Sequence, residues 1–368
     1  MIWLDIISFV FYACSAVLII FYLVVYSRFS NHQPDDSRFE KLPFVSVIIC
    51  ARNENENLKK FLPSVLNQKY PSFEVILVND GSTDGTKKTL NEDFKEFSNL
   101  FVLDFELEKE SLGKKQVLEF GIENAKGDYL VMTDADCIPS SPFWLLGMVN
   151  GFANKSELVL GVGMYENKGG FINKFIQLDT VFIIIQYISF ALSGFPYMSV
   201  GRNVAYKKTL FQNIGGFKSH YDVAGGDDDI IINEMPNSTK INVVYNSDCQ
   251  TISVPKTTWR SFIKQKSRHI SASLKYNKIN LLFLGISYFF TTFWYLSFLL
   301  MICYSSRLGI VLTIVVLKKL TLYTIFRRIF AKIGIAKLML VSLFMDIMSI
   351  FVHILATINS LKPNKGKW

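Results

Sequence analysis

Long apolar stretches lie towards both ends of the chain, and shorter apolar runs separated by polar residues fill the middle. Residues 6–26 contain no charged residue and are long enough to cross a bilayer. Residues 279–306 share both properties, whereas 308–326 and 338–361 are apolar with a few charges inside them. The pattern therefore predicts one N-terminal and about three C-terminal transmembrane helices.

The last two apolar stretches contain charged residues that hydrocarbon does not tolerate alone. Lys318 and Lys319 interrupt one stretch, and Asp346 lies in the other. Charges inside a membrane are stable when they pair with one another. We therefore expect either Lys318 or Lys319 to pair with Asp346.

Charged residues around the first apolar stretch predict the orientation of the chain. Arg28, Arg38 and Lys41 follow this stretch, and only Asp5 precedes it. Cytoplasmic loops carry an excess of lysine and arginine, so we expect the N-terminus outside and the following region in the cytoplasm. The stretch lacks the basic start and the small-residue cleavage site of a signal peptide, and we expect it to remain as an anchor.

The central region alternates between strand and helix patterns. The expected strands are Phe44–Ala51, Phe73–Val78, Leu100–Phe105 and Tyr129–Thr133, and the expected helices cover 56–67, 84–97 and 113–125. This alternation predicts an α/β fold with a mostly parallel sheet and right-handed crossovers. The whole chain then divides into a first transmembrane helix over 1–28, a linker over 29–43, an α/β domain over 44–258, a basic juxtamembrane segment over 259–278 and a C-terminal transmembrane region over 279–368.

Residues 171–195 are apolar but sit inside the α/β domain. They contain Gln177, Asp179 and Gln186, and a transmembrane helix here would cut the domain in two. We expect an amphipathic helix that lies on the membrane or beside the active site. An ordinary core helix is an equally good interpretation.

Composition and charge support a membrane protein. Half of the residues are hydrophobic, 19% are charged and the net charge is +8. The densest basic stretch, Trp259–Lys278, adjoins a long apolar segment, which favours contact with the cytoplasmic membrane surface over nucleic-acid binding. The five cysteines show no CxxC pair or metal-ligand spacing and receive no chemical role.

Two carboxylates follow the fourth expected strand at alternate positions. Asp134 and Asp136 lie directly after the apolar run 130–133. Side chains at i and i+2 of an extended segment point to the same side, at the strand end where open α/β sheets bind ligands. Paired carboxylate oxygens suit Mg²⁺ or Mn²⁺ that also contacts a substrate phosphate. A polar turn is the alternative interpretation.

Polar residues also follow the first two expected strands. Arg52-Asn53-Glu54 ends the first strand, and Asn79-Asp80-Gly81 ends the second. A carboxylate such as Asp80 can accept hydrogen bonds from a base or ribose, although a simple turn is possible. Lys114, at the start of a helix, can meet a phosphate or merely be solvated. Neither a dinucleotide fingerprint nor a P-loop is present in the sequence.

Three adjacent carboxylates, Asp227-Asp228-Asp229, precede a helix that is expected to start near Ile230. Such groups repel one another, so they either bind a cation or hold a proton through a raised pKa. A helix cap is the structural alternative. Gln265-Lys266-Ser267-Arg268-His269 lies in the basic segment, and a lipid-facing role explains its charge equally well.

Taken together, these segments resemble the family 2 glycosyltransferases, which have the GT-A nucleotide-sugar fold. The resemblance covers about residues 44–270. It rests on the segments Val45–Glu54, Val75–Thr86, Gly113-Lys114, Gly121, Ala125, Gly127-Asp128, Asp134-Ala135-Asp136, Gly201–Tyr206 and Ile214–Phe217, in this order and spacing.

The resemblance implies roles for the matching residues. Ala51, Arg52, Glu54 and Asp80 would bind the nucleoside part of the donor, Lys114, Asp134 and Ala135 would lie beside the donor, and Asp136, assisted by Asp134, would hold Mg²⁺ or Mn²⁺. Asp228 would be the general base, next to Asp227 in place of the family's glutamate. Arg202, Gln265, Arg268 and His269 would belong to the acceptor or closing segment, with His269 where the family's Gln-x-x-Arg-Trp motif has tryptophan.

The expected function is an inverting transfer of a hexose or N-acetylhexosamine from a nucleoside diphosphate sugar, with uridine as the expected base. The acceptor is expected to be lipid-linked or a polysaccharide, with membrane lipids and no nucleic acid as further partners. We favour single addition by an enzyme of the bacterial inner membrane with a cytoplasmic catalytic domain. The alternatives are a processive polysaccharide synthase, a non-catalytic membrane protein that binds nucleotide sugars, and a basic nucleic-acid-binding protein.

Overall fold

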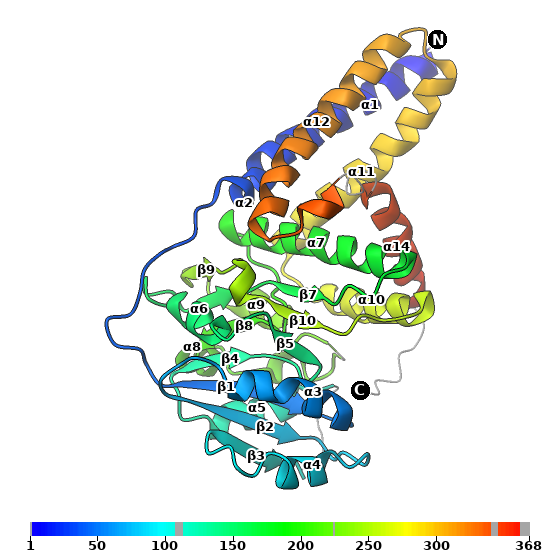
Figure 1. Ribbon diagram of the computed structural model, residues 1–368. Coiled ribbons are helices and arrows are strands. Elements are labelled where there is room, and N and C mark those ends of the chain that lie inside the picture. Colours follow the sequence, from blue (N-terminus) through cyan, green and yellow to red (C-terminus); the bar gives the residue numbers. More distant parts are fainter. Residues whose placement is uncertain (1, 107–112, 224, 340–344, 361–368) are drawn as a thin grey trace.

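The computed structural model describes residues 2–106, 113–223, 225–339 and 345–360 (Figure 1). It combines a central mixed sheet, helices on both faces of that sheet and a bundle of long apolar helices at one end of the molecule. The α/β class and the GT-A-like arrangement expected from the sequence are therefore confirmed.

The main sheet has seven strands in the order β3-β2-β1-β4-β8-β6-β9. Its first four members pair in parallel, β8 is antiparallel to both of its neighbours, and β6 pairs with β9 in parallel. The strands are β1 (Val45–Ala51), β2 (Phe73–Asn79), β3 (Leu100–Asp104), β4 (Tyr129–Met132), β6 (Leu158–Leu160), β8 (Val204–Lys207) and β9 (Ile241–Val243). The expectation of a mostly parallel sheet is confirmed.

A small second sheet follows the order β5-β10-β7, with β5 (Cys137–Pro139), β7 (Gly163–Tyr165) and β10 (Thr251–Ser253). Because β5 begins at Cys137, directly after the Asp134-Ala135-Asp136 segment, this sheet fixes the far end of that segment. The segment is thus held between two sheets.

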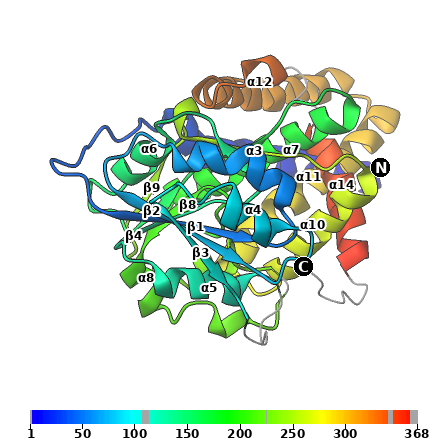
Figure 2. The same cartoon turned by 60° about the horizontal axis from the view of Figure 1, so that its bottom comes forward.

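The first strand shows why these residues form a buried sheet. Val45, Val47 and Ile49 pack into one apolar cluster, and Ile48 packs into another on the opposite face. A parallel strand covered on both sides needs such a continuous β-branched run. Figure 2 shows α3 (Asn55–Leu66) and α5 (Lys115–Asn124) on opposite sides of the strands.

The remaining shorter helices are α6 (Trp144–Asn150), α8 (Lys208–Asn213), α9 (Ile230–Glu234) and α10 (Trp259–Ser273). Of these, only α9 was expected, and it begins at Ile230 as predicted. Helix α4 (Thr86–Glu92) is shorter than the expected 84–97. Gly85 adopts a left-handed φ of 91° and Asp84 accepts a hydrogen bond from the Thr86 backbone, so the helix can only begin at Thr86.

Among the described residues, four helices are long and apolar enough to cross a membrane: Trp3–Asn31, Phe171–Leu192, Lys278–Tyr304 and Leu308–Lys332. The first comprises α1 (Ile2–Phe21), a π-helical turn (Tyr22–Tyr26) and α2 (Ser27–Asn31), and the others are α7, α11 and α12. Figure 1 shows α1, α11 and α12 side by side, directed away from the sheet.

The last described helix is α14 (Met345–Ser360), which is apolar. Its first described turn lies beside α11 and α12, and its other end lies against α10, where Asn359 Nδ2 donates to Ser267 Oγ over 2.9 Å. Within the third expected C-terminal span, 338–361, the described residues 345–360 therefore form an apolar helix that runs back towards the α/β domain.

The interpretation of residues 171–195 as an amphipathic helix on the membrane was wrong in one respect. Helix α7 has no solvated face, since 78% of its most apolar 18-residue window is buried inside the protein. It crosses between the helix bundle and the sheets (Figure 1), where both neighbours cover it. The alternatives of a core helix and of a helix beside the site are both compatible with this position.

The expected charge pair in the C-terminal region is confirmed. Lys319 Nζ lies 3.0 Å from Asp346 Oδ2, and Lys318 Nζ lies 3.6 Å from the same oxygen. Lys318 is fully buried, and its ammonium also lies 3.6 Å from the centre of the Trp294 ring. Lys318 and Lys319 of α12 therefore both contact Asp346 of α14.

Candidate functional site

The loops after β1 and β2 are bonded to each other at the carboxyl edge of the sheet. Asn53 accepts a hydrogen bond from the Thr83 backbone over 2.8 Å, and Ser82 accepts one from the Asn53 backbone over 2.9 Å. These bonds hold Asn53 in a left-handed conformation, with φ of 57°, which asparagine tolerates better than most residues.

The same loops bring together the residues expected to bind the nucleoside. Arg52 lies 3.5 Å from Asp80, whose carboxylate is buried, whereas Arg52 is partly exposed. Ala51 is buried at the end of β1. Burial raises the pKa of Glu54, and the charges of Asp136 and Asp134 raise it further. Glu54 therefore faces the paired carboxylates from the neighbouring loop.

Lys114 connects the two acidic segments of the site. Its Nζ lies 2.7 Å from Asp134 Oδ1 and 3.2 Å from Asp227 Oδ2. Burial alone would lower the pKa of Lys114, but the two carboxylates raise it well above the usual lysine value. Lys114, Asp134 and Asp227 are thus joined although they come from three separate parts of the chain.

Asp134 and Asp136 fit the oxygen ligands that Mg²⁺ or Mn²⁺ prefers. Their side-chain atoms and Cys137 Sγ all lie within 4.8 Å of one another. Burial, followed by the charge of Asp134, raises the pKa of Asp136, although the charges of Arg202 and Lys256 oppose this. Burial also keeps Cys137 a thiol by raising its pKa well above normal, so the two carboxylates are the better ligands. Ala135 between them is buried.

Asp228 and Asp229 have different surroundings although they are adjacent. Asp229 caps α9 by accepting from the Ile230 backbone, and it also accepts from the Tyr276 hydroxyl over 2.7 Å. Asp228 Oδ2 accepts a hydrogen bond from the Gly201 backbone over 3.0 Å. The capping interpretation therefore holds for Asp229 only.

The proton affinities of the three adjacent carboxyl groups also differ. Burial and then the charges of Asp227 and Asp229 raise the pKa of Asp228 to about 8. Burial raises the pKa of Asp229 to about 6, although its two hydrogen bonds oppose this. The pKa of Asp227 is lowered, because the attraction of Lys114 and Arg268 outweighs burial. Of the three, Asp228 has the proton affinity of a base that works near neutral pH.

Helix α10 and the segment before β8 complete the site from the other side. The Arg202 guanidinium stacks 4.6 Å from the centre of the Tyr165 ring and donates to the Gly163 carbonyl. Gln265 donates to the Tyr165 hydroxyl over 3.1 Å. Burial, Arg268 and Lys266 lower the pKa of His269 to about 3, so its ring is neutral.

A cavity of about 380 Å³ begins at Asp228 and Arg202. Gln265 and His269 of α10 line it, and further walls come from α7, α11 and α14. Arg268 is exposed and does not line it, although it is close enough to affect Asp227. Of the four residues expected in the acceptor segment, the structure thus brings Arg202, Gln265 and His269 to one cavity.

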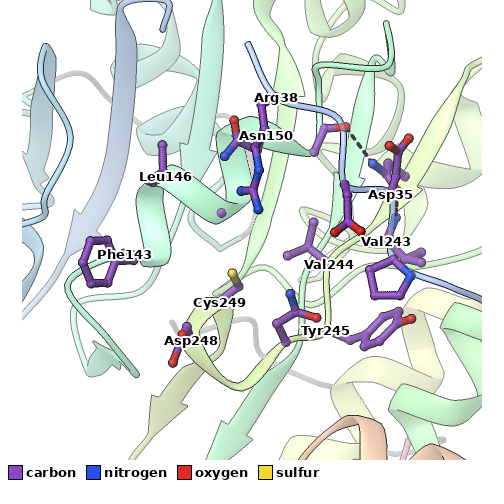
Figure 3. Close-up of a pocket in the computed structure, with 16 residues that line it drawn as sticks. Asp35, Arg38, Phe143, Leu146, Asn150, Val243, Val244, Tyr245, Asp248 and Cys249 are labelled. Atoms are coloured by element: carbon purple, nitrogen blue, oxygen red, sulfur yellow. Dashed lines mark hydrogen bonds between the residues drawn. The ribbon is translucent and has the colours of Figure 1, made fainter. Parts of the chain in front are cut away.

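A second pocket, of about 290 Å³, lies away from these carboxylates (Figure 3). The linker residues Asp35 and Arg38 face α6 and the segment around Tyr245 across it. Asp35 accepts from Ser37 and Asn154, which fastens the linker to the domain. This pocket contains none of the expected site residues.

Several residues of the site carried no recognisable signal of their own. Tyr165 belongs to the site through its contact with Arg202, and Tyr276 through its hydrogen bond to Asp229; both partners are distant in sequence. Lys266 forms an ion pair with Asp179 of α7. The one clue in the sequence was the presence of polar residues, Asp179 among them, in the otherwise apolar 171–195 stretch.

Comparison with known proteins agrees with this geometry. Residues 46–215 match the sequence profile described as glycosyl transferase family 2. The matched range contains the three loops at the sheet edge and Arg202, and it ends before Asp227. The acidic loop and the apolar helices Trp3–Asn31, Lys278–Tyr304 and Leu308–Lys332 therefore lie outside the matched range, whereas α7 lies inside it.

Two characterised proteins are similar to part of the chain. Glycosyltransferase AglE of Haloferax volcanii is 32% identical over 197 residues, which are 50% of this chain and 59% of that protein. The poly-beta-1,6-N-acetyl-D-glucosamine synthase of Staphylococcus epidermidis is 29% identical over 213 residues, 56% of this chain and 48% of the synthase. The matches thus span about half of each protein.

Among solved structures, a mannosyltransferase of Pyrobaculum calidifontis, PcManGT, in complex with GDP-Man and Mn²⁺, superposes with a TM-score of 0.61 at 18% identity. The superposition covers 95% of this chain and 99% of that one. Similarity at this level of identity establishes a shared fold that extends over nearly the whole chain.

Proposed function

Residues 46–215 form a family 2 glycosyltransferase domain, and on this premise we propose that the protein transfers a hexose or N-acetylhexosamine from a nucleoside diphosphate sugar to an acceptor at a membrane. The observation that carries the proposal is the meeting of Asp80, Lys114, Asp134 and Asp227 around Cys50, at the end of β1. These groups come from four different segments, and a structural role alone gives no reason to gather so much charge, most of it partly buried, in one place.

The donor would occupy the loops after β1, β2 and β4. Asp80 and Glu54, supported by Arg52 and Ala51, are suited to hold the base and ribose. Lys114 and Arg202 carry the positive charges that a diphosphate needs. Asp136, with Asp134, would hold Mg²⁺ or Mn²⁺, which when bound supplies positive charge to stabilise the leaving nucleoside diphosphate.

The acceptor hydroxyl would give its proton to Asp228. As this proton moves to the carboxylate, the hydroxyl oxygen forms the new bond to the anomeric carbon and the bond to the nucleoside diphosphate breaks. One displacement from the opposite face inverts the configuration of that carbon. The proton affinity of Asp228 supports this role, because a base is most effective when its pKa lies near the working pH.

The acceptor is proposed to be lipid-linked and the transfer a single addition. The long apolar helices support a membrane location, and the arginines and lysine at the domain end of α12 support a cytoplasmic domain. The domain organisation proposed is the one expected from the sequence, with the basic juxtamembrane segment over 259–278 and the C-terminal membrane region over 279–368. A bacterial inner membrane is the proposed location.

A processive polysaccharide synthase is the second candidate. It is favoured by the similarity to the staphylococcal poly-beta-1,6-N-acetyl-D-glucosamine synthase over 56% of this chain. Product length separates the two candidates, because single addition yields one product of fixed mass and processive synthesis yields a ladder.

The proposal is tested by thermal unfolding of the full chain with UDP, GDP and other nucleoside diphosphates, each with and without Mn²⁺. We expect one base to raise the unfolding temperature, and Mn²⁺ to increase that shift. Transfer from the matching nucleotide sugar to an extract of membrane lipids is then measured. A chain that binds the donor but neither hydrolyses nor transfers it would be a non-catalytic nucleotide-sugar binder.

A further inference from the structure

The lining of the cavity at Asp228 is mostly apolar, with polar groups among the hydrocarbon. The polar groups include Asp228, Arg202 and Gln265, as well as Gln186 and the ion pair of Lys266 with Asp179. The apolar part of the lining, which we call the apolar body, comes from α7, α11 and α14: Phe182, Ile183, Ile184, Leu281, Leu284, Val352 and Ala356. At about 380 Å³ it has the size of a small-molecule site.

The apolar body reaches the outer surface of a membrane-type helix. Leu281 and Gly285 of α11 line the cavity and are also exposed. They lie in the first two turns of α11, close to the α/β domain. The cavity therefore has an opening on the helix surface that would face hydrocarbon near one membrane boundary.

One buried polar group in the cavity wall supports a bound ligand. Gln186 of α7 accepts a hydrogen bond from the Tyr197 hydroxyl through its oxygen. Its Nε2 is buried and has no hydrogen-bond partner among the described residues. A buried amide donor without a partner costs free energy, which an oxygen of a ligand would recover.

We propose that this cavity binds the apolar chain of a lipid acceptor, which enters from the bilayer past Leu281 and Gly285 and presents a hydroxyl of its head group to Asp228. The inference rests on the proposed transferase function and specifies how that site selects its acceptor. A lipid is favoured over a growing glycan because the lining of the cavity is mostly apolar. A glycan would lose its hydrogen bonds to water along such a path.

Glycine at position 285 allows a direct test. A Cβ at Gly285 would meet no atom within 4 Å, so Gly285→Phe can fill the opening without a backbone clash. Gly309 of α12 provides a matched control, since a Cβ there also meets no atom within 4 Å and the residue does not line the cavity. Both residues are exposed glycines of apolar helices.

The probe is an alkyl glucoside that carries a photoreactive diazirine in its alkyl chain. In the full chain we expect crosslinks to α11 and α14, and we expect Gly285→Phe to reduce them about tenfold while Gly309→Phe leaves them unchanged. A second pair of variants keeps the test valid if Gly285→Phe fails to fold. Leu281→Trp should narrow the opening, whereas Leu282→Trp should not, since Leu282 does not line the cavity. Equal crosslinking in all four variants, or none in the wild type, would overturn the proposal.

Competition separates a lipid from a glycan. An unlabelled alkyl glucoside should suppress the crosslinks, and a soluble oligosaccharide should not; suppression by the oligosaccharide alone would assign the cavity to a glycan and overturn the inference. The thermal shift with nucleoside diphosphates is measured on the same samples. Loss of that shift in every sample would contradict the transferase function, whereas an intact shift with no crosslinks would contradict only the lipid cavity.

Discussion

The backbone N–H of Gly201 donates a hydrogen bond to Asp228 Oδ2 over 3.0 Å. A Cβ at Gly201 would lie 3.2 Å from Asp228 Cβ, so the absence of a side chain permits this close approach. The bond leaves the other carboxylate oxygen of Asp228 for a proton from the acceptor. Gly201 therefore orients the proposed base.

Replacement of Asp228 by Asn should remove transfer and leave the fold intact. The amide keeps the size and the hydrogen-bond acceptor but cannot take a proton, so the rate should fall about a hundredfold or more. The rate of transfer and the nucleotide-dependent thermal shift are measured together. Asp222→Asn is the control, because Asp222 is an exposed residue of the same region that pairs with Lys275. Wild-type turnover by Asp228→Asn would exclude this residue as the base.

The rate should depend on pH through the ionisation of Asp228. A base must be deprotonated, so kcat/KM should rise with pH and level off above about 8, the pKa to which burial raises this group. In Asp229→Asn a neighbouring negative charge is lost while the helix cap is kept, so the midpoint should move to lower pH. A midpoint that stays in place in Asp229→Asn would show that another group controls the rate.

The effect of Mn²⁺ on thermal stability should require Asp136 and not its neighbour Cys137. Asp136→Asn is expected to abolish the additional thermal shift that Mn²⁺ gives in the presence of nucleotide, because an amide oxygen is a weaker ligand than a carboxylate. Cys137→Ser should retain that shift, since the buried thiol is protonated and a serine hydroxyl can replace its hydrogen bonds. Loss of the Mn²⁺ effect in the serine variant alone would place the ion on the sulfur.

Loss of the buried charge pair should destabilise the C-terminal region. Asp346→Asn leaves Lys318 and Lys319 without their carboxylate, which should lower the free energy of unfolding by about 3 kcal/mol. Removing all three charges, with Lys318→Met and Lys319→Met added, should restore part of that loss. Thermal unfolding in detergent is the measurement, with Asp5→Asn as the control at an exposed position. An Asp346→Asn protein that unfolds at the wild-type temperature would show that the pair contributes little.

Most of the sheet edge could be predicted because its residues are marked locally. Each loop directly follows an apolar strand, and parallel strands bring their carboxyl ends to one edge, so Asp80 and Asp134 had to lie near each other. The pairing of Asp346 was predictable for a similar reason, since few partners exist for a charge among apolar residues.

The cavity could not be predicted, because its walls depend on how distant helices pack. Polar residues in α7 indicated a special position, but the ion pair of Asp179 with Lys266 requires α7 and α10 to meet. The contact between Tyr276 and Asp229 likewise joins segments 47 residues apart. The apolar composition of 338–361 predicted a span, whereas the contact of α14 with α10 follows from tertiary packing.

The position of α14 sets an order for the assembly of the protein. Ser349, Val352, His353 and Ala356 line the cavity, and the ribosome makes them after every other described wall. The sheet and the loops proposed to bind the donor can form while α14 is still inside the exit tunnel of the ribosome. The chamber around Asp228 closes only after α14 has left the tunnel, so a chain interrupted before Ser349 would keep the acidic residues of the site but lack one side of their enclosure.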